Sequence, residues 1–394
     1  MYGGAHLFTP DTTAKLGAIA LRALREHAPD SDALAGILAL DRTLASRIHP
    51  RVVAKLEREP VEDYRLDFED GFGNRPDDEE DAVATQAATH VAAGMKALLL
   101  PPGIGIRIKN LGPEMKRRGL RTFELFISTL LEQSGGTLPA NFVVTLPKIT
   151  APEQVSVLAD ACDAFESSHQ LQSGTLKFEV MIETAESVFS RDGRIALPEL
   201  LVRGRGRITA AHFGTYDYTA SMGITAAHQH MLHPSCDFAK QVMQVALAGT
   251  NVWMSDGATN IMPVGNDRAV IHAAWKMHAD QVRHSLVGGF YQGWDLHPAQ
   301  LPTRFAAVYA FFLEGLDAAS ERLKNFVQKA AKATLVGDVF DDAATGQGLL
   351  NYFLRARNCG AITEAEAVDM SGLTAGELES RSFVTILDAR RQQA

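Results

Sequence analysis

The chain has 394 residues, of which 46% are hydrophobic and 22% charged, so it can bury one large core or two smaller ones. Its net charge of -9 argues against nucleic-acid or membrane binding, which usually needs a basic patch, and a small molecule is the expected partner. The three cysteines form no C-x-x-C pair, and the sequence shows neither a secretory leader nor a membrane-spanning apolar run, so we expect a cytoplasmic protein.

Short apolar runs rich in β-forming residues alternate with helical patterns along the first part of the chain. Apolar residues recur at helical spacing between the runs, as in DAVATQAATHVAAGMKALLL. Eight such units predict an α/β fold of the TIM (β/α)₈ barrel type, with a doubly wound open sheet as the alternative. The runs are AHLF near 5, YRLDFED near 64, GIGIRIKNL near 103, FVVTLPKI near 142, LKFEVMIET near 176, RITAAHFG near 207, NVWMSDG near 251 and LVGGFYQGWDLHP near 286.

Two segments depart from this alternation. Residues 30–60 are expected to form extra helix between the first and second strands, and from residue 312 onward the sequence predicts helices alone. We therefore predict a barrel catalytic domain over 1–311 with a helical insertion near 30–60. A C-terminal helical segment over 312–394 follows, and it looks suited to packing on a neighbouring subunit.

The second run places carboxylates in what otherwise looks like a buried strand. In YRLDFEDGF, period-2 alternation sends Leu66 and Phe68 to one face and Asp67 and Glu69 to the other, and Asp70 follows at the turn. That second face must meet water, a metal or a polar site. An ordinary solvent-exposed face would explain such acids if this stretch stood alone.

Other predicted strands also end in polar residues. The active site of a barrel gathers at the C-terminal ends of its strands, so we expect these side chains to form one site. The set consists of Asp67, Glu69, Asp70, Arg107, Lys148, Glu183, Asp217, Asp256 and His297.

Two of these acids form a candidate metal site. Glu183 closes the strand in EVMIET, and Asp217 follows the next strand in FGTYD. Two protein carboxylates completed by waters and substrate oxygens suit Mg²⁺, and Mn²⁺ fits the same oxygen ligands. The alternative is that each acid only stabilises the N-terminus of a helix.

The charged residues around this pair could bind the substrate or play a structural role. Arg107, surrounded by isoleucines in GIRIKN, needs an anion, which is either a substrate carboxylate or a strand-two acid, and the two roles are compatible. Lys148 is a candidate for substrate binding. Asp256 and His297 could also touch the substrate, or they could only shape the rim through hydrogen bonds.

Three further motifs could distract from this site. HQHMLH contains His228, His230 and His233, but no regular element puts all three on one face, so a polar loop is preferred to an imidazole metal site. KRRGLR (116–121) could attract phosphate groups of a ligand, although a solvated helix face is the preferred interpretation. RGRGR (203–207) precedes a strand, so it is expected to be a turn and not a phosphate loop.

In their order along the chain, the motifs resemble those of the HpcH/HpaI aldolase and citrate lyase β-subunit family, which includes malyl-CoA lyase-like proteins. AHLFTPDTTAKLGAIA is similar to the opening strand and loop of that family, LDFEDGFGNRPDDEEDA to its Asp-x-Glu-Asp strand, and IRIKN to its arginine strand. LPKI, IET, FGTYDY and GFYQGWDLHPAQ match its Pro-Lys, metal-glutamate, Gly-x-x-Asp and His-Pro-x-Gln elements. The chain resembles a divergent member.

The resemblance implies a Mg²⁺-dependent barrel that makes or breaks a carbon–carbon bond through an enolate. Glu183 and Asp217 would be the metal ligands, Arg107 would hold the substrate carboxylate or the enolate oxygen, and the strand-two acids would help proton transfer. In the CoA-lyase branch a further acid comes from the C-terminal segment, and GDVFDDAATGQ places Asp341 there, with Asp342 in a competing register. The resemblance also implies a homo-oligomer, a trimer or a hexamer.

We therefore expect a metal-dependent carbon–carbon lyase that acts on a hydroxy acid or its CoA thioester. Within the enzymes, the alternatives are an aldolase that releases pyruvate from a 2-keto-4-hydroxy acid, and an acyl-CoA thioesterase. A non-catalytic barrel that binds a carboxylate or CoA is the rival of a different class, and a metal with open positions argues against it. The sequence leaves open which of Asp67, Glu69, Asp70 or Asp341 accepts the proton.

Overall fold

The computed structural model of the chain describes residues 1–332 and 340–393, without the side chains of 328–332, 340–343, 391 and 393. The chain divides into two compact units. Unit 1 consists of Met1–Arg22, Leu56–Ala274 and His284–Leu301, and unit 2 of Ala23–Lys55, Trp275–Arg283 and Pro302–Ala394. No helix of the described part is long and apolar enough to cross a membrane.

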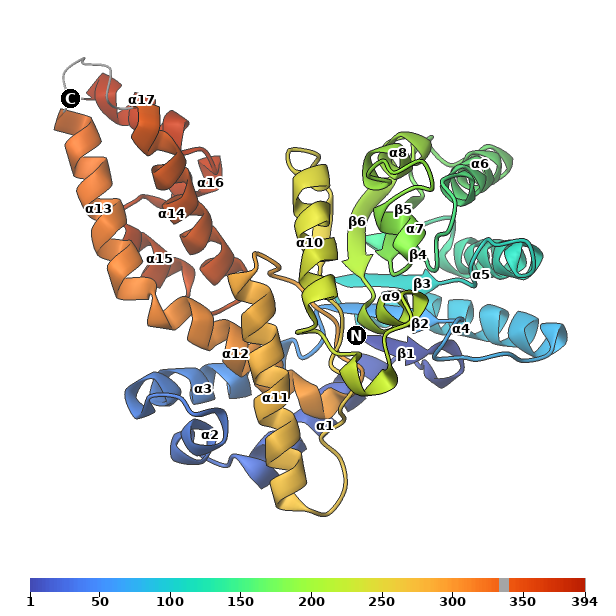
Figure 1. Cartoon of the computed structure of the whole chain (residues 1–394), viewed down its shortest axis with the longest axis horizontal. Coiled ribbons are helices and arrows are strands. Elements are labelled where there is room, and N and C mark those ends of the chain that lie inside the picture. The colour runs from blue at the N-terminus through green and yellow to red at the C-terminus, as the bar shows by residue number, and fades with distance from the viewer. Residues whose placement is uncertain (333–339, 394) are drawn as a thin grey trace. The chain divides into compact units, whose positions relative to one another are not determined.

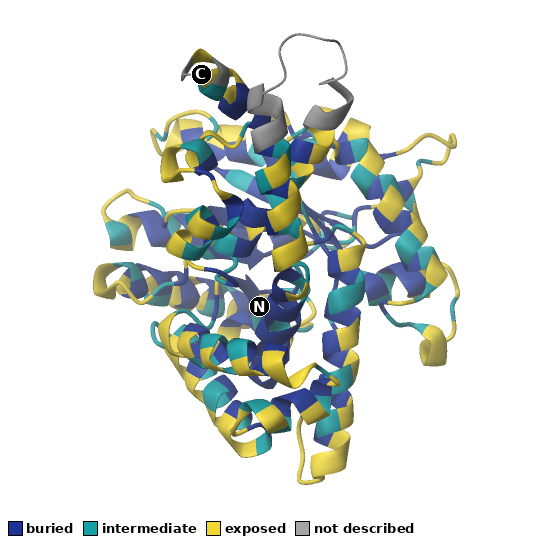
Figure 2. Cartoon of the chain, turned by 90° about the vertical axis from the view of Figure 1, so that its left-hand side faces the viewer, coloured by how far each residue is buried: buried dark blue, intermediate teal, exposed yellow. Residues whose placement is uncertain are grey.

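A seven-stranded sheet forms the centre of unit 1. Every neighbouring pair is parallel, and the strands follow one another in chain order. The five central strands are almost wholly buried, whereas most exposed residues lie on helices and loops and one, Trp253, begins the last strand (Figure 2). The predicted α/β fold with parallel strands is thereby confirmed. The strands are β1 (Tyr2–Gly4), β2 (Asp63–Asp67), β3 (Gly103–Arg107), β4 (Phe142–Leu146), β5 (Lys177–Ile182), β6 (Ile208–Phe213) and β7 (Trp253–Ser255).

The expected eighth strand is reduced to a single bridge between Ser255 and Gln292. Its first residues belong instead to the end of helix α11 (Arg268–Val287), and two glycines follow, of which Gly289 has a φ of 85°. Glycines weaken a strand because they cost more backbone entropy and give no side chain to pack. The sheet therefore curls as a half-barrel, and backbone closure into a barrel is not seen among the described residues.

The first strand is also displaced from its predicted position. It spans Tyr2–Gly4, whereas the run expected to be a strand begins with a short 3₁₀ helix over Ala5–Leu7. The Tyr2 side chain packs on Trp294, with ring centroids 4.6 Å apart, so side chains fill the space between β1 and the segment after β7.

The helices of unit 1 cover the outside of this sheet. Helices α4, α5, α6 and α8 follow one another around it (Figure 1). The helices are α4 (Asp77–Ala97), α5 (Lys116–Ser134), α6 (Glu153–Ser168), α7 (Ala185–Val188), α8 (Leu197–Arg203), α9 (Thr215–Ser221) and α10 (Pro234–Leu247).

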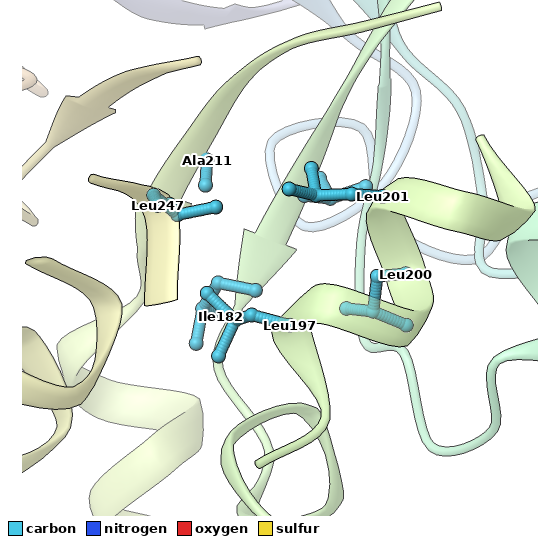
Figure 3. Close-up of a pocket in the computed structure, with 7 residues that line it drawn as sticks. Ile182, Leu197, Leu200, Leu201, Ala211 and Leu247 are labelled. Carbon is cyan, nitrogen blue, oxygen red and sulfur yellow. The ribbon is translucent and has the colours of Figure 1, made fainter. Parts of the chain in front are cut away.

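The layer between sheet and helices is apolar. Ile182 of β5 and Ala211 of β6 meet Leu197 and Leu200 of α8 and Leu247 of α10 around a gap that is too narrow to admit a water molecule (Figure 3). No polar side chain lines this gap, so it belongs to the packing between layers. Side chains alternate along a strand, and Ile182 points to this outer layer. Glu179 in β5 and Glu183 directly after it therefore point to the opposite, inner face of the sheet.

Unit 2 is helical throughout its described residues. Helices α13, α14, α15 and α17 pack against one another around apolar residues such as Leu323, Phe353 and Phe383. Helices α1 (Thr12–His27), α3, α11 and α12 contribute residues to both units. The domain limits of 1–311 and 312–394 stay a prediction. The other helices are α2 (Ser31–Leu38), α3 (Arg42–Arg58), α12 (Leu301–Glu314), α13 (Leu316–Lys332), α14 (Phe340–Asn358), α15 (Glu364–Ser371), α16 (Ala375–Ser380) and α17 (Phe383–Gln393).

Candidate active site

Asp67 and Arg107 face each other at the ends of the paired strands β2 and β3. Arg107 donates from Nε to Oδ1 of Asp67 at 2.7 Å and from Nη2 to Oδ2 at 2.5 Å. Asp67 also accepts the backbone N–H groups of Glu69 (3.0 Å) and Gly71 (2.7 Å), and it is buried. These four hydrogen bonds occupy the lone pairs of the carboxylate, so the structural pair foreseen for Arg107 is confirmed.

Glu69 and Asp70 lie in the turn after β2 and meet the ammonium of Lys148. Lys148 donates from Nζ to Glu69 and to Oδ1 of Asp70 at 2.8 Å. Burial raises the pKa of Glu69 to about 7, although Arg107 and Lys148 oppose this rise. For Asp70 burial also acts upward, but hydrogen bonds from Glu69 and Lys148 outweigh it and lower the pKa. The two neighbouring acids therefore differ in their readiness to take a proton.

Glu183 follows β5 directly and is only 2% exposed. Its Oε1 accepts the backbone N–H of Lys148 at 2.7 Å. Burial raises its pKa to about 7, and the charge of Asp217 adds to the rise. Position 214, which faces Glu183, requires a glycine, because a Cβ there would lie 2.5 Å from both Cβ and Oε2 of Glu183.

Asp217 lies in the first turn of α9, and Oδ2 is 3.7 Å from the Lys148 ammonium. Partial burial raises its pKa. The neighbouring Tyr216 fixes this helix: its hydroxyl donates to the carbonyl of Ala258 at 3.0 Å and accepts the N–H of Asn260 at 2.9 Å. The segments after β6 and β7 are thus tied together beside the acid.

Lys109 is a residue of this region that the sequence analysis missed. Its buried ammonium donates to the carbonyls of Phe68 (2.8 Å) and Gly73 (3.3 Å) and lies 2.8 Å from Oε2 of the fully buried Glu80 in α4. It therefore holds both ends of the turn that carries Glu69 and Asp70. The signal was present, because Lys109 is two residues after Arg107 and shares its face under period-2 alternation.

Two other candidate residues stand apart from this cluster. Asp256 is buried, pairs with Lys240 at 2.9 Å and accepts from Ser285 at 2.6 Å. His297 accepts the N–H of Ala299 at 3.1 Å and caps a short 3₁₀ helix. Substrate contact by either residue stays a prediction. The side chain of Asp341 lies outside the described residues.

The motifs that could have distracted from the site make local contacts. In HQHMLH, His233 caps α10 by accepting the N–H of Ser235. In KRRGLR, Arg118 and Arg121 both pair with Asp81 of α4. RGRGR forms the expected turn after α8. Its Arg205 (φ 50°) pairs with Asp160 and Asp163 of α6, and its Arg207 with Glu166 and Asp163.

The residues around Glu183 fit a hard divalent cation. Glu183 is a buried carboxylate, and its hydrogen bond comes from a neutral N–H, while the charge of Asp217 acts on it unfavourably. Within the described residues, no group of three or more His, Cys, Asp or Glu could hold a metal ion. Two protein carboxylates completed by waters and substrate is nevertheless the usual way in which Mg²⁺ is held.

A family model described as a domain of unknown function (DUF6986) matches residues 1–386. No curated protein matches the sequence. Among solved structures, a citrate lyase from Burkholderia xenovorans is similar with a TM-score of 0.55 and 19% identity, covering 82% of this chain and 91% of its own. A malate synthase from Haloferax volcanii in a magnesium and glyoxylate complex has a TM-score of 0.49 and 14% identity, covering 89% and 92%. The likeness to the citrate lyase concerns the fold alone, and the likeness to the malate synthase is too weak to support a conclusion.

Proposed function

The chain belongs to the DUF6986 family, and we propose that it is a Mg²⁺-dependent carbon–carbon lyase that acts through an enolate on a hydroxy acid or its CoA thioester. The observation that carries this proposal is the meeting of four acids at Lys148: Glu69, Asp70 and Asp217 lie around its ammonium, and Glu183 accepts its backbone N–H. Acids gathered in this way from several strand ends suit metal-assisted chemistry better than a purely structural role.

The metal would be held by Glu183 and Asp217, and Mn²⁺ fits the same oxygen ligands. When bound, it would supply the positive charge that stabilises an enolate. Arg107 binds Asp67 through Nε and Nη2, so its Nη1, 3.6 Å from Oε2 of Glu69, is the group left for a substrate carboxylate. Asp67 thereby orients the guanidinium.

Glu69 is the acid that we assign to proton transfer. Asp67 is excluded from this role by its four hydrogen bonds, and Asp70 by its lowered pKa and its 57% exposed side chain. Glu69 is buried beside Arg107, and its pKa of about 7 lies in the range where a group can both take and return a proton. Asp341 keeps its predicted role as a further acid.

The test is exchange of α-protons in D₂O, followed by NMR. Acetyl-CoA, propionyl-CoA, pyruvate and oxaloacetate are offered in turn, each with Mg²⁺ and with EDTA. We expect metal-dependent exchange into one of them, and a loss of about 10²-fold or more in Glu183→Gln and Glu69→Gln. Exchange into pyruvate instead of a thioester would identify the aldolase alternative. Unchanged exchange in Glu183→Gln would contradict the metal assignment.

Three attributes complete the proposal. We infer a small carboxylate or an acyl-CoA as the substrate, since Arg107 can bind an anionic group while Glu183 and Asp217 bind the metal ion. A cytoplasmic location agrees with the free thiols of Cys162, Cys236 and Cys359. A homo-oligomer, a trimer or a hexamer, stays a prediction that light scattering of the full chain can test.

A further inference from the structure

Lys148 makes contact with four acids of the site, Glu69, Asp70, Glu183 and Asp217. Its ammonium donates to Glu69 and Asp70 and lies 3.7 Å from Oδ2 of Asp217. Its backbone N–H donates to Oε1 of Glu183 at 2.7 Å. One residue thus serves both carboxylates that are proposed to hold the metal ion and both acids of the turn after β2.

The backbone of Lys148 takes an unusual conformation to do this. Its φ is 50°, in the left-handed region that a residue with a Cβ seldom adopts. Such a conformation persists only where the surroundings hold it, and it occurs preferentially at functional sites. The carboxylates that surround the ammonium and the bond to Glu183 supply that hold.

The charges around Lys148 do not balance. Arg107 is paired with Asp67 and also lies 3.6 Å from Glu69 and 3.7 Å from Asp70, so the four acids Glu69, Asp70, Glu183 and Asp217 are compensated by this already paired guanidinium and by the ammonium of Lys148. A divalent ion at Glu183 and Asp217 would need oxygen from Asp217, to which the ammonium is already attracted. Two cations so close together repel each other, and they do so most strongly where water is largely excluded.

We propose that Lys148 is an internal competitor of the divalent ion: its ammonium holds Glu69, Asp70 and Asp217 together in the metal-free protein and lowers the metal affinity of the site. This inference rests on the proposed function, because it takes Glu183 and Asp217 as the metal ligands. It assigns to Lys148 a role in setting metal affinity, in addition to its predicted role in substrate binding.

The test measures Mn²⁺ binding to the full chain by titration calorimetry and by the EPR signal of free Mn²⁺. Lys148→Met and Lys148→Gln remove the charge and keep the backbone N–H, so we expect the Kd to fall about tenfold or more. Lys148→Arg keeps the charge and should stay within about threefold of the wild type, on the same Coulomb reasoning. Lys276→Met, which removes a charge from the exposed pair with Asp280, is the matched control and should bind as the wild type does.

The outcomes separate the inference from the function on which it rests. If the wild type and Glu183→Gln bind Mn²⁺ alike and neither neutral Lys148 variant binds more tightly, the metal site itself is misassigned. If Glu183→Gln loses binding but both neutral Lys148 variants bind no more tightly than the wild type, Lys148 positions the ligands and the competitor role is overturned. Tight binding by Lys148→Met or Lys148→Gln where the wild type binds weakly or not at all supports it. Circular dichroism checks folding, and the second neutral variant serves if the first fails to fold.

Discussion

Asp67 and Arg107 form a buried pair of two hydrogen bonds across β2 and β3, with Nε to Oδ1 at 2.7 Å and Nη2 to Oδ2 at 2.5 Å. The guanidinium also lies over the ring of Tyr2, 4.7 Å from its centroid. Because both charges are withdrawn from water, each depends on the other, and Asp67 has no lone pair left for a substrate proton. The pair gives Asp67, the last residue of β2, a positioning role, and of the two acids in the following turn Glu69 is the one assigned to proton transfer.

Asp67→Asn should therefore act first on stability. The amide removes the charge that compensates Arg107, and loss of one partner of a buried pair costs about 3–5 kcal/mol. Urea denaturation followed by circular dichroism measures the free energy of unfolding. Asp70→Asn is the matched control, because its side chain is 57% exposed and its surface pair should contribute less than about 1 kcal/mol. An equal loss of unfolding free energy in Asp67→Asn and Asp70→Asn would contradict the positioning role of Asp67.

Gly214→Ala should damage the metal site without unfolding the protein. The new methyl group would lie 2.5 Å from Cβ and Oε2 of Glu183, so that side chain must shift from its place beside Asp217. We expect Mn²⁺ affinity to fall about tenfold or more, since a displacement of this size removes a first ligand from its position. Titration calorimetry measures it.

Gly36→Ala is the control for this change. Gly36 lies in α2, and nothing stands within 4 Å of its added Cβ. Alanine in an exposed helix is favoured over glycine by about 0.5–1 kcal/mol, so this variant should be slightly more stable and bind Mn²⁺ normally. If both variants bind alike, the close approach of Gly214 to Glu183 has no functional role.

Lys109→Met should loosen the turn that carries Glu69 and Asp70. The ammonium holds the carbonyls of Phe68 and Gly73, and its loss also leaves the buried Glu80 with Arg118, 3.4 Å from its Oε1, as its remaining cation. Hydrogen–deuterium exchange of peptides covering 66–76 should accelerate about tenfold or more, which corresponds to about 1.4 kcal/mol of local opening. Lys96→Met in the last turn of α4 should leave these amides unchanged. Faster exchange over the whole chain would indicate global destabilisation instead.

The sequence predicted the site best where a residue stands at a strand end. Glu183 and Lys148 follow β5 and β4, and parallel neighbours bring their ends to one edge, so order along the chain was sufficient. The different roles of Asp67 and Glu69 could not be predicted, since alternation puts both on one face. The structure separates them because β2 ends at Asp67, and the backbone carbonyl of Glu69 then accepts the N–H groups of Phe72 and Gly73 in a turn.

The burial of Glu80 and the loss of the eighth strand could not be predicted, because local sequence patterns do not contain the contacts that determine them. Glu80 is one of five acids in DDEED, and nothing in the sequence distinguishes the one that is fully buried against Lys109. The eighth strand was expected from apolar composition, but Gly288 and Gly289 end a helix there and leave one bridge at Gln292. The entropy that the two glycines would lose in a strand outweighed the gain from burying the apolar residues beside them.

Glu179 should make the protein sensitive to acid. Its buried carboxylate accepts from Arg65 at 2.6 and 3.0 Å and lies 2.9 Å from Nε2 of His212. Burial opposes ionisation, but Arg65 and His212 outweigh it and hold the pKa well below the ordinary 4.5. A lowered pKa in the folded state stabilises the protein above about pH 4.5, and this contribution is lost as the pH falls from there toward the folded value.

Glu179→Gln removes this titration, which gives the prediction its measurement. Between about pH 4.5 and pH 3, the free energy of unfolding of the wild type should fall by up to about 1.4 kcal/mol per pH unit more than that of Glu179→Gln, because one proton is taken up on unfolding. Urea denaturation at several pH values gives both curves. Glu132→Gln on the exposed face of α5 should follow the wild type. Parallel curves for wild type and Glu179→Gln would mean that the buried pair with Arg65 does not govern acid stability.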